Sequence, residues 1–245
     1  MKIGPLFKWF GSKWQSGKHY PPPEHDLVIE PFAGGAGYSL NHSERTAILW
    51  EEDPHLIALW KWLIFDATPA LVRDIPVGLA IGTDIRQIGL SSGQALLLKH
   101  WQRTNNVGDC WTVSPWGHLP GQWTNNTRSR VAEEIEGVKH WRVEPPVHYI
   151  DRPATWFVDP PYLYNYRYRR DLPAFDHSSL DRFAQTVSKE SLVLFCEAAE
   201  KGTGRMPDYL PFAPSHRSIT SRRKESQSHH SSELIYIQRP CGHAS

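Results

Sequence analysis

The chain has 245 residues, of which 40% are hydrophobic, and this is enough for one sizeable core with a small insertion. Its formal net charge of +1 excludes a general basic field, so binding to nucleic acid would need local groups of cations. The three scattered cysteines have no metal-type spacing and are too few for a disulfide framework, and no apolar run reaches the roughly 18 residues of a membrane span. We therefore expect an intracellular, cytoplasmic protein without a membrane segment or a bound metal.

An aromatic and basic cluster surrounds a Gly-Ser turn near the N-terminus. Residues 6–13 read Leu-Phe-Lys-Trp-Phe-Gly-Ser-Lys and show neither a helical nor a strand period. An exposed Trp9 could hold an adenine ring, and Lys13 could hold a carboxylate. Taken alone, the segment would be interpreted as a frayed terminus.

The first strand is predicted over residues 27–30, and a glycine-rich turn, Pro-Phe-Ala-Gly-Gly-Ala-Gly at 31–37, follows it. A strand, a tight glycine loop and a helix form the first unit of an open α/β sheet, in which ligands bind at the carboxyl ends of the strands. Phe32 and Gly34 lie in this loop. The loop lacks the dinucleotide pattern G-x-G-x-x-G, and Glu30 would repel a pyrophosphate. An uncharged or cationic nucleoside fits better.

Three acidic residues follow a second predicted strand at residues 46–50. An acidic residue at the tip of the second strand of such a unit commonly accepts the two ribose hydroxyls of an adenosine ligand, and Glu51 is the best placed. For Glu52 and Asp53 the alternative explanation is favourable negative charge at the start of a helix. Asp53 followed by proline predicts that start, and the core-facing residues of the helix are then Leu56, Trp60, Leu63 and Ile64.

The middle of the chain, residues 66–130, has the least regular pattern. A helix is predicted over 92–102, whereas 104–130 has the composition of a loop rich in asparagine, tryptophan and arginine. Because this length exceeds that of ordinary connections, it indicates a functional loop or a small insertion. A further helix is predicted over 131–138, and a strand should follow near 141–143.

The most informative stretch is a buried strand predicted at residues 155–158, which stops at Asp159, Pro160, Pro161 and Tyr162. Two prolines cannot continue a ladder, so the chain leaves the sheet in a stiff loop. The Asp159 carboxylate and the Pro160 carbonyl could accept the two N–H groups of an aromatic amine and localise its lone pair, while Tyr162 stacks on the ring. The alternative is a strand that ends in a turn, with Asp159 as a cap.

Cations gather in two places beyond this loop. Tyrosines alternate with Arg167, Arg169 and Arg170, which could supply stacking and phosphate contacts. The alternative for these residues is a solvated basic edge strand. A second group lies in the tail: Arg222, Arg223 and Lys224.

The α/β alternation continues to the end of the chain. Asp176 has the position of a helix cap, and the next buried strand is predicted over 192–196. The segments 216–224 and 233–237 are predicted to form a terminal hairpin.

Taken in order, these motifs resemble the Dam-type class of adenine-specific DNA methyltransferases, which use S-adenosylmethionine. Residues 6–13 look like the N-terminal cofactor motif of this class, with Ser12 in place of the usual second glycine. Residues 30–34 look like its glycine-loop motif, although Ala36 breaks a strict F-x-G-x-G pattern. Glu51 takes the position of the ribose-binding acid, which is usually aspartate.

The resemblance extends to the second half of the chain. Residues 159–162, Asp-Pro-Pro-Tyr, look like the catalytic motif, and 217–219 together with 233–235 resemble the C-terminal motif. Residues 104–130 do not resemble the usual target-recognition segments of the class, so the resemblance implies no particular DNA sequence as the target.

The resemblance implies an α/β fold with a Rossmann-like methyltransferase sheet and helices on both faces, formed by 1–65 and 131–245. Residues 66–130 would be a helical and loop-rich insertion and a candidate DNA-recognition segment. The implied activity is methyl transfer to N6 of an adenine flipped out of double-stranded DNA, by a monomer.

The implied site residues fall into three groups. Catalysis is assigned to Asp159, Pro160, Pro161 and Tyr162. S-adenosylmethionine is assigned to Trp9, Lys13, Glu30, Phe32, Gly34, Glu51 and Asp159. DNA is assigned to Arg167, Arg169, Arg170, Arg222, Arg223 and Lys224.

Two other interpretations remain open from the sequence. An RNA adenine methyltransferase could use the same catalytic residues, and it would transfer methyl groups to RNA but not to duplex DNA. A nucleoside-binding module without catalysis would bind the cofactor and transfer nothing to any polymer.

Overall fold

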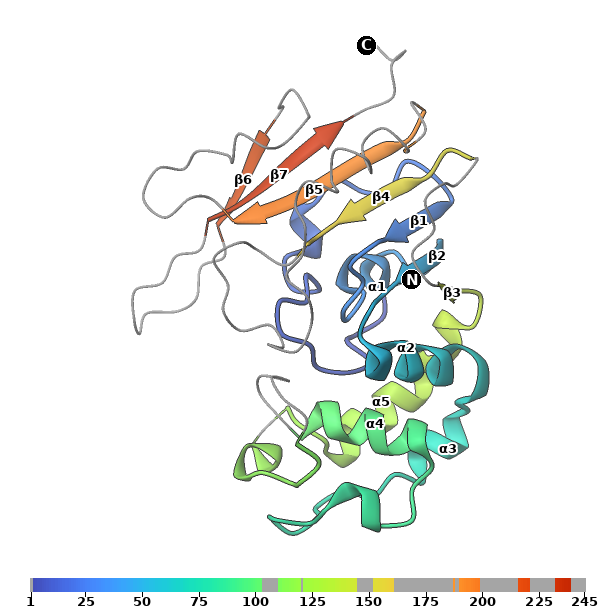
Figure 1. Ribbon diagram of the computed structural model, residues 1–245, viewed down its shortest axis with the longest axis vertical. Helices are drawn as coiled ribbons and strands as arrows, with labels where there is room; N and C mark the ends of the chain where they lie inside the picture. The colour runs from blue at the N-terminus through green and yellow to red at the C-terminus, as the bar shows by residue number, and fades with distance from the viewer. Residues whose placement is uncertain are drawn as a thin grey trace.

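The computed structural model describes residues 2–102, 110–119, 121–144, 152–160, 187 and 190–198, and the backbone of 216–220 and 232–238. Within these ranges the protein is α/β, with one twisted sheet and a group of helices beside it (Figure 1). None of the described helices is long and apolar enough to cross a membrane.

Seven strands form the sheet in the order β3-β2-β1-β4-β5-β7-β6. The strands from β3 to β5 are parallel, whereas β7 runs antiparallel to both of its neighbours. Because the chain moves outward from β1 to β3 and then crosses to β4, the order reverses between β1 and β4. Ligands of open α/β sheets bind at the carboxyl ends of the strands at such a switch point. The strands are β1 Leu27–Glu30, β2 Thr46–Trp50, β3 Arg142–Glu144, β4 Thr155–Val158, β5 Leu192–Ala198, β6 His216–Thr220 and β7 Ser232–Gln238.

The predicted strands are confirmed. β1, β2 and β4 begin and end where the apolar runs do, and β5 extends two residues beyond its predicted end. The terminal hairpin is present as the antiparallel pair β6 and β7. Each central strand is buried along its whole length or all but its first residue, as continuous apolar runs predict for parallel strands.

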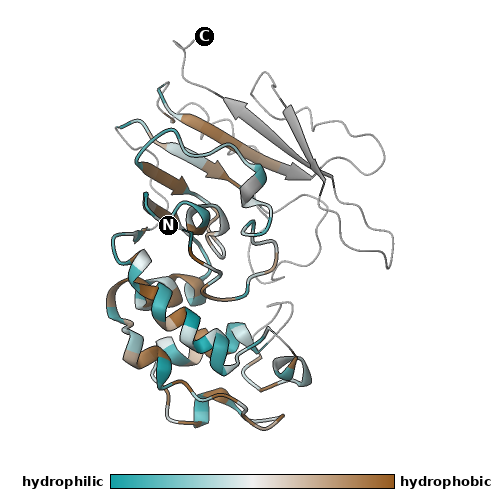
Figure 2. Cartoon of the chain, turned by 180° about the vertical axis from the view of Figure 1, so that it is seen from behind, coloured by the Kyte–Doolittle hydropathy of each residue, from teal (hydrophilic) through white to brown (hydrophobic). Residues whose placement is uncertain are grey.

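Two clusters of buried apolar side chains pack on the sheet, one on each face. The central parallel strands are coloured largely as hydrophobic in Figure 2. On one face Tyr38, from helix α1 (Gly37–Asn41), stacks on Phe157 with a centroid distance of 4.4 Å. On the other face Trp50 and Trp156 meet edge to face at 5.3 Å. Phe32 packs against that second cluster. Helix α1 therefore packs on one face of the sheet, and helices on both faces stay a prediction.

Helix α2 (Pro54–Lys61) begins as predicted. The Asp53 carboxylate accepts a hydrogen bond from His55 N at 2.8 Å, and Pro54 occupies the first helical position. The four predicted core-facing residues are all buried: Leu56, Trp60, Leu63 and Ile64. The remaining helical segments are η1 Gly17–His19, the π-helical η2 Trp62–Asp66, α3 Pro69–Arg73, η3 Ile85–Gln87, α4 Ser92–Trp101, η4 Pro115–His118, α5 Asn125–Glu134 and η5 Ile135–Val138.

One part of the insertion was predicted wrongly. Residues 104–130 were expected to be a loop, but helix α5 begins at Asn125, six residues before its predicted start. Thr124 caps it by accepting a hydrogen bond from Thr127 N at 3.3 Å. Two consecutive asparagines favour a turn locally, and the cap together with the buried Val131 and Ala132 overrides that preference.

The insertion shares one core with the N-terminal segment. Ile3, Leu6 and Phe7 belong to the same buried cluster as the apolar residues of α4 and α5. Trp101 Nε1 in α4 donates to the Leu6 carbonyl at 2.9 Å, and Arg130 Nη2 in α5 donates to the Pro5 carbonyl at 2.7 Å. These bonds hold the backbone that leads into Trp9 and Lys13.

Candidate cofactor and amine site

The glycine-rich loop turns sharply after β1. Gly34 has a φ of 47°, in the left-handed region, and Ala36 has a φ of 46°. Trp60 Nε1 in α2 donates to the Gly34 carbonyl at 2.9 Å, and Ala33 N donates to the Trp50 carbonyl at 3.1 Å. The loop is thus fixed to both β2 and α2.

The N-terminal motif lies directly on this loop. A Cβ atom added at Gly34 would come within 2.5 Å of Trp9 Nε1, and one added at Gly37 would come within 2.7 Å of Lys13 N. Trp9 is consequently half-buried, and the expectation of an exposed ring was wrong. Glycine is needed at Gly34 both for its backbone conformation and for the close approach of Trp9.

Lys13 connects the N-terminal motif to the end of β4. Its Nζ lies 2.5 Å from Asp159 Oδ2 and 3.3 Å from the Gly11 carbonyl oxygen. The two side chains of the ion pair are only 11% and 17% exposed, so the pair is shielded from solvent screening. Pro160 follows as a buried residue, whereas Pro161 and Tyr162 lie outside the described residues.

The Glu51 carboxylate, at the end of β2, accepts three backbone hydrogen bonds, one of them from the glycine loop. Its Oε2 accepts from Gly34 N at 2.9 Å, and its Oε1 accepts from Glu52 N at 2.8 Å and Asp53 N at 3.2 Å. Burial raises the pKa of the Glu51 carboxyl, and the three backbone N–H groups oppose that rise. A carboxylate has about four lone-pair positions. These donors engage three of them and leave one acceptor position.

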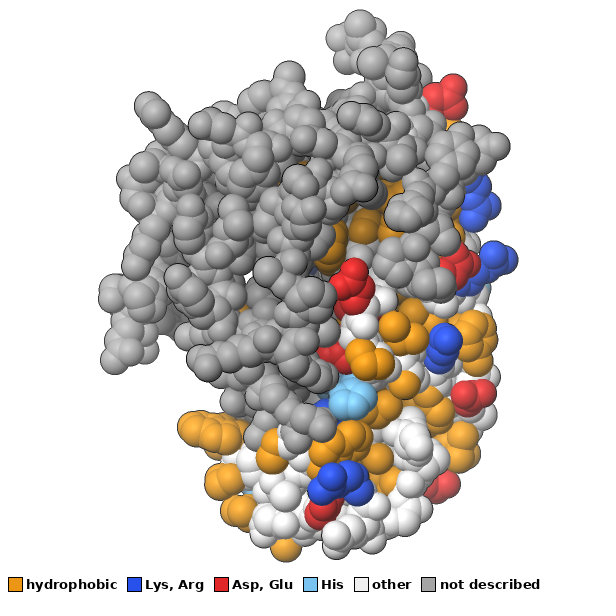
Figure 3. Space-filling model, in the orientation of Figure 1, with side chains coloured by type: hydrophobic (Ala, Val, Ile, Leu, Met, Phe, Trp, Pro, Cys, Tyr) orange, Lys and Arg blue, Asp and Glu red, His pale blue; other side chains and the backbone are white. Residues whose placement is uncertain are grey.

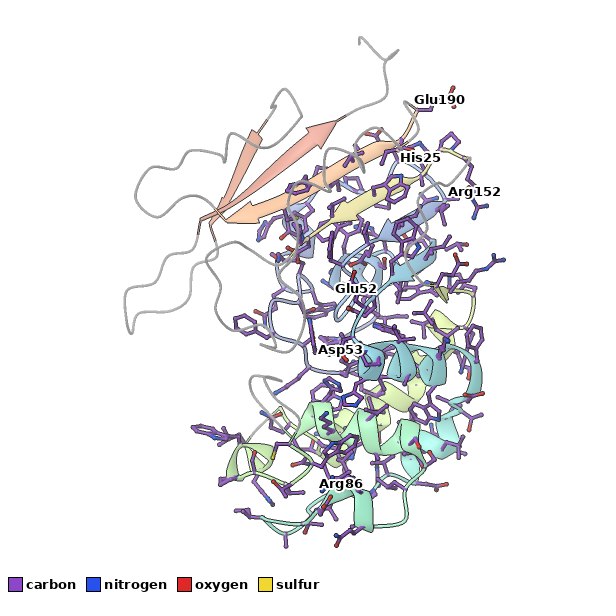
Figure 4. All side chains as sticks on the ribbon, in the orientation of Figure 1. His25, Glu52, Asp53, Arg86, Arg152 and Glu190 are labelled. Carbon is purple, nitrogen blue, oxygen red and sulfur yellow. The ribbon has the colours of Figure 1, made fainter. Side chains whose placement is uncertain are left out.

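The two other acidic residues of the trio have the roles that helix-start electrostatics predicts. Asp53 caps α2, and the Glu52 side chain is exposed. Figure 4 places both between the sheet and the helices, and acidic side chains lie on the surface at the same place in Figure 3, next to hydrophobic ones. His25, Arg152 and Glu190 lie at the opposite end of the sheet in Figure 4, so they are remote from the site.

Glu30 is the most deeply buried acid of the site. It is 3% exposed, and its Oε1 accepts from Ser39 N in α1 at 2.7 Å. The pKa of Glu30 is raised to about 7, chiefly by burial; the hydrogen bonds from Ser39 and the charge of Lys13 oppose the rise, and the Asp159 carboxylate adds to it. A buried carboxylate of this kind favours a neighbouring positive charge.

We expect the protonation of Glu30 to make folding stability depend on pH. Since the pKa is higher in the folded than in the unfolded protein, its stabilising contribution is full below the unfolded value and is lost as pH rises through about 7. Relative to Glu30→Gln, whose amide oxygen can still accept from Ser39 N, wild type should lose about 2–3 kcal/mol of unfolding free energy between about pH 5 and pH 8.5.

Chemical denaturation of both proteins across that pH range measures this difference. If the unfolding free energies of wild type and Glu30→Gln changed with pH in the same way, the pKa of Glu30 would not be raised in the folded protein, and this prediction would be wrong.

The structure brings together six of the predicted cofactor residues. Trp9, Lys13, Gly34 and Asp159 contact one another in pairs, and Glu30 and Glu51 lie at the ends of β1 and β2 beside them. Phe32 instead contributes to the apolar cluster on the other face of the sheet. Sequence reasoning assigned Trp60 to the core and missed that its indole N–H fixes the Gly34 carbonyl. No local pattern signals that contact.

The predicted DNA contacts lie outside the described residues: Arg167, Arg169, Arg170, Arg222, Arg223 and Lys224. Three arginines in the insertion have intramolecular contacts. Arg86 pairs with Asp84, Arg130 pairs with Glu134, and Arg128 Nη1 donates to the Ile75 carbonyl at 3.1 Å.

A scan of the sequence against models of known protein families finds no match, and a search of curated proteins finds no similar one.

Proposed function

We propose that this protein is a DNA methyltransferase that transfers a methyl group from S-adenosylmethionine to the N6 amine of adenine. The observation that carries the proposal is the Lys13–Asp159 ion pair, because it joins the N-terminal motif to the strand that ends in Asp-Pro-Pro-Tyr. Trp9 lies on Gly34 in the same place. Three motifs far apart in the sequence thus meet at the switch point of a parallel sheet, where such sheets bind nucleosides.

The charges of the site fit the amino-acid end of this cofactor. Lys13 supplies a cation for a carboxylate, and Glu30 supplies an acceptor for an ammonium group. Glu51 has a lone pair directed away from its three backbone donors for a ribose hydroxyl. Trp9 supplies an aromatic surface beside the loop.

The chemistry follows from the position of Asp159 at the end of β4. When bound, S-adenosylmethionine supplies an electrophilic methyl group. Asp159 and the Pro160 carbonyl accept the two N–H groups of the adenine amine and so direct its lone pair at that carbon. After the amine nitrogen had accepted the methyl group, the Asp159 carboxylate would take the proton that the methylated amine releases.

Transfer of tritiated methyl groups from S-adenosylmethionine to DNA and to RNA, assayed in parallel, tests the proposal. We expect incorporation into DNA. Incorporation into RNA alone would favour the RNA methyltransferase. Cofactor binding without transfer to either polymer would favour the nucleoside-binding module.

We expect Arg167, Arg169 and Arg170 to hold DNA phosphates, because a flipped base must be kept in the pocket while the flanking backbone is fixed. Replacing all three with alanine should weaken binding to any DNA sequence and flatten the dependence of log K on log salt by up to roughly three units. The preferred methylation site should stay the same.

Fluorescence anisotropy over a salt series measures this slope. Full affinity together with a changed methylation site would instead mean that these arginines contact bases.

A further inference from the structure

The ion pair at the end of β4 creates a conflict within the proposed mechanism. Asp159 is the acceptor for the adenine amine, yet the Lys13 ammonium lies 2.5 Å from its Oδ2. An ammonium at that distance occupies one of the about four lone-pair positions of the carboxylate and offsets its negative charge, so the remaining positions accept more weakly. Asp159 is thus a poorer acceptor for the amine as long as Lys13 stays in place.

Lys13 has the means to move. Its contacts with Asp159 and with the Gly11 carbonyl are made by the end of a flexible side chain, and the bond to Gly11 is the longer of these two, at 3.3 Å. Gly11 itself has a φ of 82°, so the turn places the lysine over the end of β4 without help from a β-branched or bulky residue. A second anion near Lys13 would compete directly with Asp159.

We propose that Lys13 is a displaceable cap on Asp159, and that the carboxylate of the cofactor opens the site by taking the ammonium from it. This rests on the proposed function and adds to it an order of events. The cofactor binds first and makes Asp159 available, and only then does the adenine amine gain its acceptor. Lys13 acts here as a positioning residue, because it controls the amine through Asp159.

The experiment compares two short oligonucleotides that differ only in the exocyclic amine: oligo(dA) and the same oligomer built from purine without the amine. The ratio of their dissociation constants measures what the amine contributes. For wild type we expect S-adenosylhomocysteine to raise this ratio by about tenfold or more over its ligand-free value, as one hydrogen bond to a charged acceptor predicts. Methylthioadenosine, which lacks the carboxylate, should leave the ratio at its ligand-free value.

Lys13→Met removes the cap without changing the backbone. The variant should prefer oligo(dA) by a similar factor with or without S-adenosylhomocysteine. If Lys13 had only a structural role, its replacement would not change how this ratio depends on the ligand. Lys8→Met is the matched control, because Lys8 lies in the same segment and its Nζ lies over the Trp101 ring at 5.5 Å. This control should keep the ligand dependence of wild type.

A ratio that S-adenosylhomocysteine does not raise in wild type, or a ligand-free ratio in Lys13→Met no higher than that of ligand-free wild type, would overturn the cap. So would a preference that methylthioadenosine induces as well as S-adenosylhomocysteine does. If any of these contradicting results is found but the protein still methylates DNA, the proposed function stands and only the role of Lys13 as a cap is wrong. If no methyl group reaches any nucleic acid, the function itself is wrong.

Discussion

Asp159→Ala is expected to lower methyl transfer by a hundredfold or more, with little change in the binding of DNA. The carboxylate is the charged acceptor at the end of β4, and removal of one such preorganised group costs about 3 kcal/mol or more in comparable sites. The rate of Asp159→Asn should lie between those of wild type and Asp159→Ala, because the amide oxygen can still accept one N–H group but carries no charge. Single-turnover rates with excess enzyme measure the chemical step directly.

Asp26→Ala is the matched control for this change. Like Asp159, Asp26 forms an ion pair, in its case with Arg45. The Asp26 side chain is 96% exposed, so this pair contributes little to stability. We expect wild-type rates from this control. A rate for Asp159→Ala within about tenfold of wild type would remove Asp159 from the catalytic role.

Glu51→Ala is expected to weaken S-adenosylmethionine binding by tenfold or more. The change removes the acceptor of a ribose hydroxyl, and it also leaves the N–H groups of Gly34, Glu52 and Asp53 without the carboxylate that holds them. Hydrogen bonds to a charged group contribute about 1.5–3 kcal/mol each, so both losses act in the same direction. Titration calorimetry measures the affinity.

Glu52→Ala is the control here. Glu52 is the adjacent glutamate, but its side chain is exposed and its backbone N–H still reaches Glu51. The affinity of this variant should match that of wild type. Unchanged affinity in Glu51→Ala, or a loss in Glu52→Ala instead, would place the ribose contact elsewhere in the acidic trio.

The strands and the start of α2 could be predicted from the sequence because their signals are local. The apolar runs that become β1 and β4 end at Pro31 and at Asp159-Pro160, residues that stop a ladder by their own chemistry. The start of α5 could not be predicted in the same way. Asn125 and Asn126 favour a turn on their own, and only the Thr124 cap and burial of the following turn make them helical.

The candidate site could be predicted as a set of residues but not as an arrangement. Sequence order suggested that Lys13, Gly34 and Asp159 belong together, yet nothing local indicates that Lys13 and Asp159, 146 positions apart, form an ion pair. The half-buried position of Trp9 depends on the missing side chain of Gly34, which is a property of tertiary packing. Likewise, the Gly34 N–H reaches Glu51 only because the glycine loop folds back to the end of β2, whereas the other two donors, Glu52 N and Asp53 N, are neighbours in the sequence.

The most direct test of the central claim is the identity of the methylated nucleoside. DNA incubated with the protein and S-adenosylmethionine carrying a deuterated methyl group is digested to nucleosides and analysed by mass spectrometry. We predict labelled N6-methyldeoxyadenosine with wild type and a loss of about a hundredfold with Asp159→Ala. Label on cytosine, or equal label on adenine from Asp159→Ala, would contradict the assignment of Asp159 as the acceptor of the adenine amine.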